Sequence, residues 1–352
     1  MQTKQQIKKI LIGGSSGFIG TALIRHLQEQ GMYDIYQLVR RPVTGGYEIE
    51  WDPERSSIDT HAIETIQPEV IIHLGGENIM GFWTEQKKKK ILDSRVKSTK
   101  LLSDTIATLK HKPQLFICAS GCTYYGSDVY LPVDEYSPKG TGFFSNVVEK
   151  WEKACDTARY ENNLPGSLVN SASHQDLHSS VDSNISISTG PMDQLNFSTD
   201  SLESSSNHLY NINNTNTNTN ESSMTPSSKV RIVNLRIGLV FDRSGAFLST
   251  VYYPFKFGLG GVMGSGNQWI PWISLRDTCR SIQYIIENDD LNGPVNITGP
   301  NPTTNSTFTR MMGYVLNRPT IFWVPEFLIK LVLGSEMAKE TILSSQRVIP
   351  TK

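Results

Sequence analysis

Short apolar runs alternate along the chain with segments of helical spacing. Residues 7–12 form a short apolar run, residues 35–39 and 47–51 are predicted as the second and third strands, and residues 18–30 repeat apolar side chains at helical intervals. Residues 70–74 form a nearly continuous apolar run, as expected for a strand buried on both faces. Helices are predicted over 85–109 and 144–159, and strands over 115–118 and 230–237. This alternation predicts an α/β fold, a doubly wound parallel sheet of the Rossmann type.

Two changes in composition divide the chain. Residues 166–228 are dominated by Ser, Asn and Thr and predict a disordered insertion, because such a segment buries too little apolar surface to order itself. After Gly238 the strand–helix rhythm breaks and Gly, Pro and aromatic residues become frequent. We therefore predict that 1–165 and 229–242 build the Rossmann domain and that 243–352 form a small C-terminal lobe on the substrate side.

Charge and composition exclude several classes of function. The formal net charge is −1, so no overall field attracts nucleic acid or an anionic membrane. The run Lys87–Lys90 has no interleaved aromatic residues and is better explained as the solvated start of a helix. The four cysteines fit no zinc or disulfide pattern, so no metal is expected. The N-terminus resembles no leader and no run is long enough to span a membrane, which predicts a cytoplasmic protein.

A glycine-rich turn joins the first predicted strand to the first predicted helix. Gly14, Gly17 and Gly20 have the spacing G-x-x-G-x-x-G. Glycines there allow a tight turn and a close approach of the backbone to a diphosphate, and the helix N-terminus offers free N–H groups. Because the turn lies between a strand and a helix, the motif predicts a dinucleotide site rather than an ordinary loop.

Two arginines follow the second predicted strand. NAD-binding folds usually place a carboxylate there for the ribose diol, whereas this chain has Arg40 and Arg41. A guanidinium suits a 2′-phosphate because its planar fork donates two parallel hydrogen bonds. NADP(H) is therefore the expected cofactor, and a solvated strand end is the alternative explanation of the pair.

Taken together, these motifs resemble the extended, atypical short-chain dehydrogenase/reductases. More narrowly, the chain is similar to the NAD-dependent epimerase/dehydratase-like subgroup that carries a C-terminal DUF1731 segment. Further motifs that carry the resemblance are His73–Ile79, Ser94–Thr99, Ser120–Gly126, Arg236–Gly238, Pro254–Gly261, Gly264–Gln268, Trp272–Asp277 and Ser345–Pro350. The cofactor contacts that the resemblance implies are Gly14, Gly17, Phe18, Ile19, Gly20, Arg40, Arg41, Asp52, Leu74, Gly75 and Arg95.

The resemblance also shows what this chain lacks. Working short-chain reductases use a Tyr that exchanges a proton with the substrate and a Lys four residues later. The corresponding positions hold Phe144 and Val148, and the usual Ser position holds Gly121, next to Ser120. A Tyr-x-x-x-Lys pattern occurs at Tyr252–Lys256, but it contains a proline and lies in the wrong region.

Other polar residues must therefore serve any chemistry. Tyr124, Tyr125 and Glu77 are the weak candidates for catalytic groups, and Asn78, Gln268 and Trp272 are expected in the substrate pocket. His73 is the lone candidate base near the cleft, but its place inside an apolar strand favours a core histidine.

Three functions remain open from the sequence. The first is an NADP(H)-dependent oxidoreductase or epimerase-like enzyme that acts on an unknown small molecule with an atypical proton donor. The second is a non-catalytic NADP(H)-binding sensor or scaffold protein. The third, a conventional nucleotide-sugar epimerase, is disfavoured by Phe144 and Val148. Because members of the subgroup usually continue past the Gln-Arg-Val-x-Pro motif, the C-terminal lobe is expected to be truncated.

Overall fold

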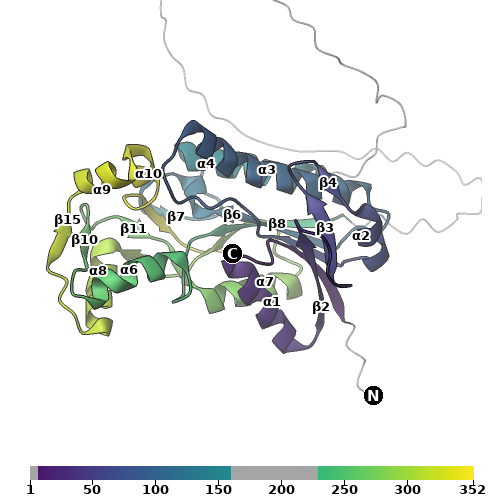
Figure 1. The fold of residues 1–352 in the computed structure, drawn as a ribbon, viewed down its shortest axis with the longest axis horizontal. Helices are drawn as coiled ribbons and strands as arrows, with labels where there is room; N and C mark the ends of the chain where they lie inside the picture. The colour runs from purple at the N-terminus through teal and green to yellow at the C-terminus, as the bar shows by residue number, and fades with distance from the viewer. Residues whose placement is uncertain (1–6, 160–228) are drawn as a thin grey trace, which may run out of the picture. The chain divides into compact units, whose positions relative to one another are not determined.

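The computed structural model describes residues 7–159 and 229–352, and the predicted insertion 166–228 lies outside this part. An eight-stranded sheet runs through the centre in the order β13-β8-β6-β5-β1-β2-β3-β4 (Figure 1). Its strands are β1 (Lys8–Gly13), β2 (Tyr33–Val39), β3 (Glu48–Asp52), β4 (Ser57–Ile58), β5 (Val70–His73), β6 (Leu115–Gly121), β8 (Arg231–Ile237) and β13 (Gly293–Ile297). All neighbouring pairs are parallel except β3 with β4.

The register brings the carboxyl ends of the central strands to one edge. Gly13 at the end of β1 is paired with His73 at the end of β5, and His73 is paired with Cys118 of β6. The strand order reverses between β1 and β5, where one half of the sheet runs toward β4 and the other toward β13. In open α/β sheets this switch point forms the crevice that binds ligands.

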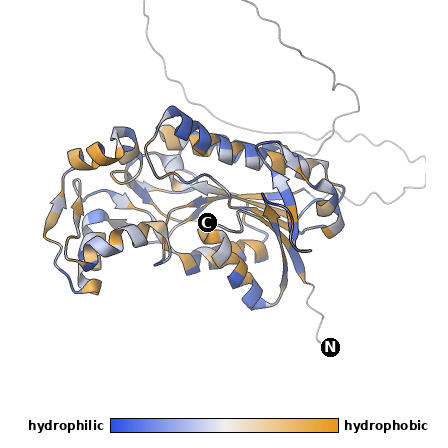
Figure 2. Ribbon diagram, viewed as in Figure 1, coloured by the Kyte–Doolittle hydropathy of each residue, from blue (hydrophilic) through white to orange (hydrophobic). Residues whose placement is uncertain are grey.

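Helices cover both faces of the sheet (Figure 1). α1 (Phe18–Gln30) and α7 (Leu275–Glu287) pack on one face, where Leu23, Leu27 and Ile282 are completely buried. The other face is covered by α2 (Thr60–Ile66), α3 (Glu85–Thr108), α4 (Phe143–Lys153) and α5 (Asp156–Arg159). Figure 2 shows the hydrophobic residues concentrated in the strands and in the helix faces turned toward them. The prediction of a doubly wound α/β fold is confirmed.

Several element boundaries follow from local sequence. α1 begins after Gly17 and ends at Gly31, whose φ of 68° is left-handed and favours glycine, so the predicted range 18–30 is confirmed. α3 begins at Thr84, whose side chain accepts a hydrogen bond from the backbone N–H of Lys87. The helix predicted over 144–159 is instead two helices, α4 and α5, separated at Ala154 and Cys155.

The sequence pattern missed one strand of the main sheet, β13 (Gly293–Ile297), and the helix that precedes it, α7 (Leu275–Glu287). α7 and β13 continue the strand–helix rhythm after residue 238, and β13 pairs in parallel with β8. They lie within the range predicted for the C-terminal lobe. Glycines and prolines between residues 254 and 271 hide the rhythm, although Ile282, Ile285 and Ile286 have the spacing of a buried helix face.

Apart from α7 and β13, the range predicted for the C-terminal lobe, residues 243–352, forms short helices and two-stranded sheets, two of which take one strand from residues 128–133 and 239–241. Its helices are α6 (Ala246–Lys256), α8 (Asn305–Leu316), α9 (Glu326–Leu333) and α10 (Ser335–Glu340). The paired strands are β9 (Leu239–Phe241) with β12 (Trp272–Ser274), β10 (Gly261–Met263) with β15 (Phe322–Val324), β11 (Trp269–Ile270) with β14 (Thr303–Thr304), and β7 (Asp128–Val133) with β16 (Ser345–Val348). A short 3-10 helix, η1 (Cys122–Tyr125), follows β6.

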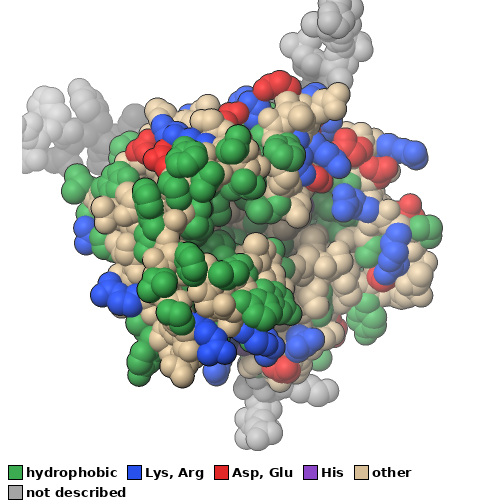
Figure 3. All heavy atoms as spheres, turned by 60° about the vertical axis from the view of Figure 1, so that its left-hand side comes forward, with side chains coloured by type: hydrophobic (Ala, Val, Ile, Leu, Met, Phe, Trp, Pro, Cys, Tyr) green, Lys and Arg blue, Asp and Glu red, His purple; other side chains and the backbone are tan. Residues whose placement is uncertain are grey.

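Large apolar side chains remain exposed on this lobe. They include Tyr314, Val315, Ile321, Trp323, Phe327 and Leu331. Figure 3 shows hydrophobic side chains gathered around a hollow on the face that carries the lobe. Among the described residues, no helix has the length and apolar content needed to cross a membrane.

Candidate functional site

A cleft of about 420 Å³ opens at the switch point of the sheet. It lies where β1, β2, β3 and β5 end, which is the edge predicted from the glycine loop. The residues that line it are Gly14, Ser15, Ser16, Gln37, Leu38, Val39, Arg40, Arg41, Trp51, Asp52, Pro53, Glu54, His73, Gly75, Gly76, Glu77, Ser94 and Ser98. Five residues expected to contact the cofactor are therefore brought together, namely Gly14, Arg40, Arg41, Asp52 and Gly75.

The glycine loop packs backbone against backbone. Gly14 has a φ of 82°, and a Cβ atom there would lie 2.6 Å from the backbone nitrogen of Gly75. A Cβ atom on Gly20 would collide with the carbonyl oxygen of Gly14. The N–H of Gly17 donates to this same carbonyl at 3.1 Å, which closes the turn at the start of α1. The loop therefore has the tight turn and the helix N-terminus that a diphosphate requires.

The two arginines after β2 have different surroundings. Arg41 donates to both carboxylate oxygens of Glu48 and to Thr44 Oγ1, and the backbone N–H of Thr44 also donates to Glu48. The hydrogen bond from Arg41 is the main reason why the pKa of Glu48 falls to about 2. Arg40 is exposed and forms no ion pair or hydrogen bond with another described side chain. Arg40 is thus the arginine whose guanidinium is available to a ligand.

Asp52 ends β3 beside the basic pair. Its Oδ1 accepts hydrogen bonds from the backbone N–H groups of Glu54 and Arg55, at 3.0 and 3.3 Å. These bonds hold the carboxylate within a turn at the rim of the cleft. Trp51, the residue before it, is buried and contributes to the cleft wall.

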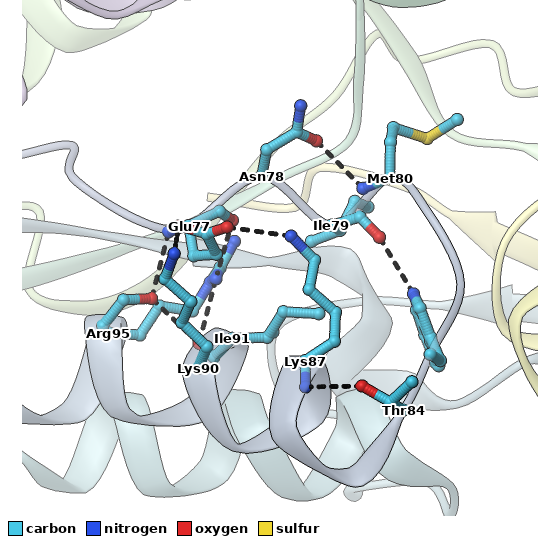
Figure 4. A network of polar contacts seen from close by, with 11 residues as sticks. Glu77, Asn78, Ile79, Met80, Thr84, Lys87, Lys90, Ile91 and Arg95 are labelled. Atoms are coloured by element: carbon cyan, nitrogen blue, oxygen red, sulfur yellow. Dashed lines mark hydrogen bonds and ion pairs between the residues drawn. The ribbon is translucent and has the colours of Figure 1, made fainter.

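Glu77 lies at the centre of a polar network between the loop after β5 and helix α3 (Figure 4). Lys87 donates to its carboxylate at 2.8 Å and lowers the pKa of Glu77, while Lys90 lies 3.5 Å away. Arg95 donates to the backbone carbonyls of Glu77 and Ile91. Burial lowers the pKa of Arg95 to about 10, and its guanidinium lies beneath Gly76 rather than on the cleft wall. Glu77 is therefore a carboxylate held in its ionised form.

A second polar network is buried where β6, β8 and α4 meet. The guanidinium of Arg236 forms two hydrogen bonds of 2.9 Å with Glu152, and Ser120 donates to the same carboxylate at 2.7 Å. Arg236 also donates to the hydroxyl of Tyr125, which itself donates to Asn296. Burial raises the pKa of Tyr125 to about 12. The hydroxyl of Tyr125 is therefore already engaged both as a donor, to Asn296, and as an acceptor, from Arg236.

Tyr124 differs from its neighbour. The guanidinium carbon of Arg236 lies over the ring of Tyr124, 3.5 Å from the ring centroid. The side chain is half-buried, and its hydroxyl forms no hydrogen bond with another described residue. Of the two tyrosines, Tyr124 is the one with an uncommitted hydroxyl.

The remaining predicted residues are dispersed. Gly17 and Phe18 line a second cleft of about 420 Å³ beside α1, together with Thr21, Arg25, Asp242 and Ser244. Ile19 and Leu74 pack against the hydrophobic core. Of the residues expected in the substrate pocket, Asn78 accepts from the N–H of Met80 in an exposed loop and Gln268 is buried with hydrogen bonds to two backbone carbonyls. Trp272 stacks on Phe241 and donates to the carbonyl of Asn301.

Sequence reasoning placed His73 near the cleft but favoured a core histidine, and it did not assign Trp51, Ser94 or Ser98 to the site. Trp51 and Ser98 are buried and His73 completely so, and these three residues line the cleft and form its floor. Ser94 and Ser98 are one helical turn apart and so lie on the same face of α3. This spacing indicates that both line the cleft only once α3 is known to lie beside β5.

Comparisons with known proteins identify the family to which the chain is similar. Residues 10–142 match the model of the NAD dependent epimerase/dehydratase family, and residues 324–352 match the domain of unknown function DUF1731. An epimerase family protein of Mycobacterium leprae is 30% identical over 342 residues, which cover 97% of this chain and 88% of that protein. The mouse epimerase family protein SDR39U1 is 29% identical over 98% of this chain and 92% of its own length.

Solved structures of epimerases have a similar fold. The crystal structure of human epimerase family protein SDR39U1 with NADPH is 26% identical and has a TM-score of 0.69, covering 97% of this chain and 91% of that chain. A nucleoside-diphosphate sugar epimerase from Corynebacterium glutamicum has a TM-score of 0.60 at 21% identity, over 97% of this chain and 60% of its own, and shows the shared fold alone. By the extent of these similarities, this chain belongs to the NAD dependent epimerase/dehydratase family and carries a DUF1731 segment at its C-terminus.

Proposed function

We propose that the cleft binds NADP(H), and that the chain is an oxidoreductase or epimerase-like enzyme acting on a small molecule. The observation that carries the proposal is that the glycine loop and Arg40 open onto one cleft. The diphosphate would rest on the N–H groups that begin α1, and Arg40 would hold the 2′-phosphate. The human relative whose structure contains NADPH supports this choice of cofactor.

Bound NADPH supplies a hydride, so the protein must provide the orientation and the proton. The family resemblance implies Tyr and Lys at the positions that Phe144 and Val148 occupy in this sequence, and both residues lie on α4. The ring of Phe144 packs edge-on against Trp83 at 4.9 Å, and Val148 lies against Gly121. Neither side chain can hold a proton, so any acid must come from another element.

Tyr124 is the candidate that the geometry favours. The proton of Tyr125 is engaged with Asn296, and Lys87 keeps Glu77 ionised. Tyr124 follows β6 directly, carries an uncommitted phenol, and has a cation stacked on its ring. We infer that the Oη atom of Tyr124 exchanges the proton that Phe144 cannot provide.

A non-catalytic sensor is the second candidate function, and the apolar cluster around α4 favours it. Phe144, Val147 and Ile91 are buried with Ile79 and Trp83 packed against them. Phe144, at one of the two positions where the resemblance implies a catalytic side chain, is thus packed among hydrocarbon side chains.

Two experiments test both functions. The first titrates the protein fluorescence with NADPH and with NADH, and the second screens carbonyl compounds and nucleotide sugars for turnover. The enzyme proposal predicts preferential NADPH binding and turnover that Tyr124→Phe reduces by about 10²- to 10⁴-fold, the usual effect of losing a general acid. Tyr252→Phe is the matched control and should leave turnover unchanged. NADPH binding without turnover of any compound would support the sensor, and failure to bind either dinucleotide would refute both.

A further inference from the structure

One buried side chain in the floor of the cleft is only half satisfied. His73 ends β5 and is completely buried. Its Nε2 atom lies 2.8 Å from Ser98 Oγ, while its Nδ1 atom has no hydrogen-bond partner in the described part of the chain. Buried polar atoms without partners are uncommon and are often explained by a ligand or an ordered water molecule.

The hydrogen bonds around Ser98 fix the tautomer of His73. The hydroxyl of Ser98 donates to the backbone carbonyl of Ser94 at 2.6 Å. Its single hydrogen is therefore used, and its oxygen can only accept from His73. Nε2 consequently carries the ring hydrogen, and Nδ1 presents a lone pair.

Two glycines, Gly13 and Gly75, lie next to the unpartnered Nδ1 atom of His73. A Cβ atom on Gly13 would be 3.0 Å from Nδ1, and one on Gly75 would be 3.5 Å away. Trp51 meets the ring edge-on, with centroids 5.6 Å apart. Gly13 and Gly75 therefore pack their backbones closely on the buried Nδ1 atom with no side chain between, and both His73 and Gly75 line the cleft.

The ring does not satisfy Nδ1 by taking up a second proton. Burial, assisted by the positive charge of Arg95, lowers the pKa of His73 to about 4. The histidine therefore stays neutral near pH 7, and Nδ1 remains an acceptor.

We propose that Nδ1 of His73 accepts a hydrogen bond from a hydroxyl group of the bound dinucleotide and so fixes the nucleotide against the floor of the cleft. This inference rests on the proposed NADP(H) site. In this role His73 is a binding residue that accepts a hydrogen bond in its neutral form. It is neither a general base nor a purely structural core histidine. The ligand class is a nucleotide that offers a ribose hydroxyl within reach of the turn formed by Gly14 and Gly75.

Nitrogen NMR of the imidazoles in ¹⁵N-labelled full-length protein tests the inference without any turnover. The free protein should show His73 with hydrogen on Nε2 and a bare Nδ1. NADP⁺ should shift the Nδ1 resonance in the direction of an accepted hydrogen bond and leave Nε2 nearly unchanged. His26, which is bonded to Gln283 on α7, is the internal control and should not move.

A variant provides a second readout. His73→Phe keeps a planar ring without an acceptor, and calorimetry should show about a five- to tenfold loss of NADP⁺ affinity, as expected for one hydrogen bond. His26→Phe should bind with unchanged affinity. If His73→Phe does not fold, the wild-type NMR experiment still decides the question.

The outcomes separate the two proposals. If NADP⁺ binds but the Nδ1 resonance stays in place, or if His73→Phe keeps full affinity, the role of His73 is refuted while the cofactor site stands. If inorganic pyrophosphate, which carries no ribose hydroxyl, causes the same Nδ1 shift, the hydroxyl assignment is also refuted. If neither dinucleotide binds the wild-type protein, the proposed function itself fails.

Discussion

The carboxylate of Glu340 accepts hydrogen bonds from the backbone N–H of Phe144 at 3.2 Å and from that of Phe143 at 3.0 Å. A residue at the end of α10, inside the DUF1731 segment, therefore caps α4, the helix that borders the candidate catalytic region. Gly142 precedes the helix with a φ of 114°, and a Cβ atom there would collide with Glu340. The cap links the C-terminal lobe to the main sheet.

Replacing Glu340 with Ala should therefore destabilise the protein. Loss of a helix cap typically lowers the free energy of unfolding by about 1–2 kcal/mol. Urea denaturation measures the effect. Glu336→Ala, which removes a surface ion pair with Lys88, is the control and should cost less than about 1 kcal/mol. Equal losses from both variants would argue against a specific cap.

Arg40 and Arg41 should differ in their effect on cofactor choice. Arg40→Ala should weaken NADPH by about tenfold or more while leaving NADH nearly unchanged, because a charge-assisted hydrogen bond to the 2′-phosphate is lost. Arg41→Ala should weaken both cofactors similarly, because Arg41 is bonded to Glu48 and Thr44 within the loop. Calorimetry with both cofactors measures the ratio. Equal losses of NADPH and NADH in Arg40→Ala would contradict the phosphate assignment.

Stability should fall between pH 6.5 and pH 4 because of His73. Its pKa is about 4 in the folded protein and 6.5 ordinarily, so in this window the unfolded chain binds a proton that the folded chain does not. The stabilisation is complete above pH 6.5 and is lost as the pH falls toward 4, by up to about 3 kcal/mol. Chemical denaturation at pH 7 and pH 4.5 should show this loss.

The matching control for this pH effect is His73→Phe. That variant should be less pH-dependent across the same window. Glu48 and Glu149, whose pKa values are lowered to about 2, contribute stability that is lost only at lower pH. An unchanged pH profile in His73→Phe would mean that other groups cause the loss.

The buried pair of Arg236 and Glu152 should be expensive to break. Glu152→Gln leaves the Arg236 charge buried without its partner and should cost about 3–5 kcal/mol. Thermal or urea unfolding measures the loss, and Glu149→Gln on the same helix serves as the exposed control. A loss below about 1 kcal/mol would show that water or another group compensates the arginine.

The sequence predicted those parts of the fold that depend on local pattern. The limits of α1 follow from Gly17 and Gly31, and the glycine loop follows from its place between a strand and a helix. The alternation up to β8 was clear enough to predict the parallel sheet. β13 escaped detection because its signal is short and follows a region rich in glycine and proline.

The candidate site was less predictable because its chemistry depends on contacts between distant residues. Arg41 is bonded to Glu48 across a loop, a pairing that the two adjacent arginines do not reveal. Tyr124 and Tyr125 are neighbours with identical side chains, yet only Tyr125 is committed to Arg236 and Asn296. Which nitrogen of His73 carries the ring hydrogen depends on the hydrogen bonds of Ser98, a contact between β5 and α3 that no spacing rule encodes.

The direct backbone contact between Gly14 and Gly75 has a mechanical consequence. Because backbone meets backbone there with no side chain between, a displacement of the turn after β1 should also displace the turn after β5. Any molecule that displaces one turn must also displace the other, and the second turn leads into Glu77 and helix α3. A ligand bound at the start of α1 would therefore also shift the turn after β5 and, through it, Glu77 and helix α3.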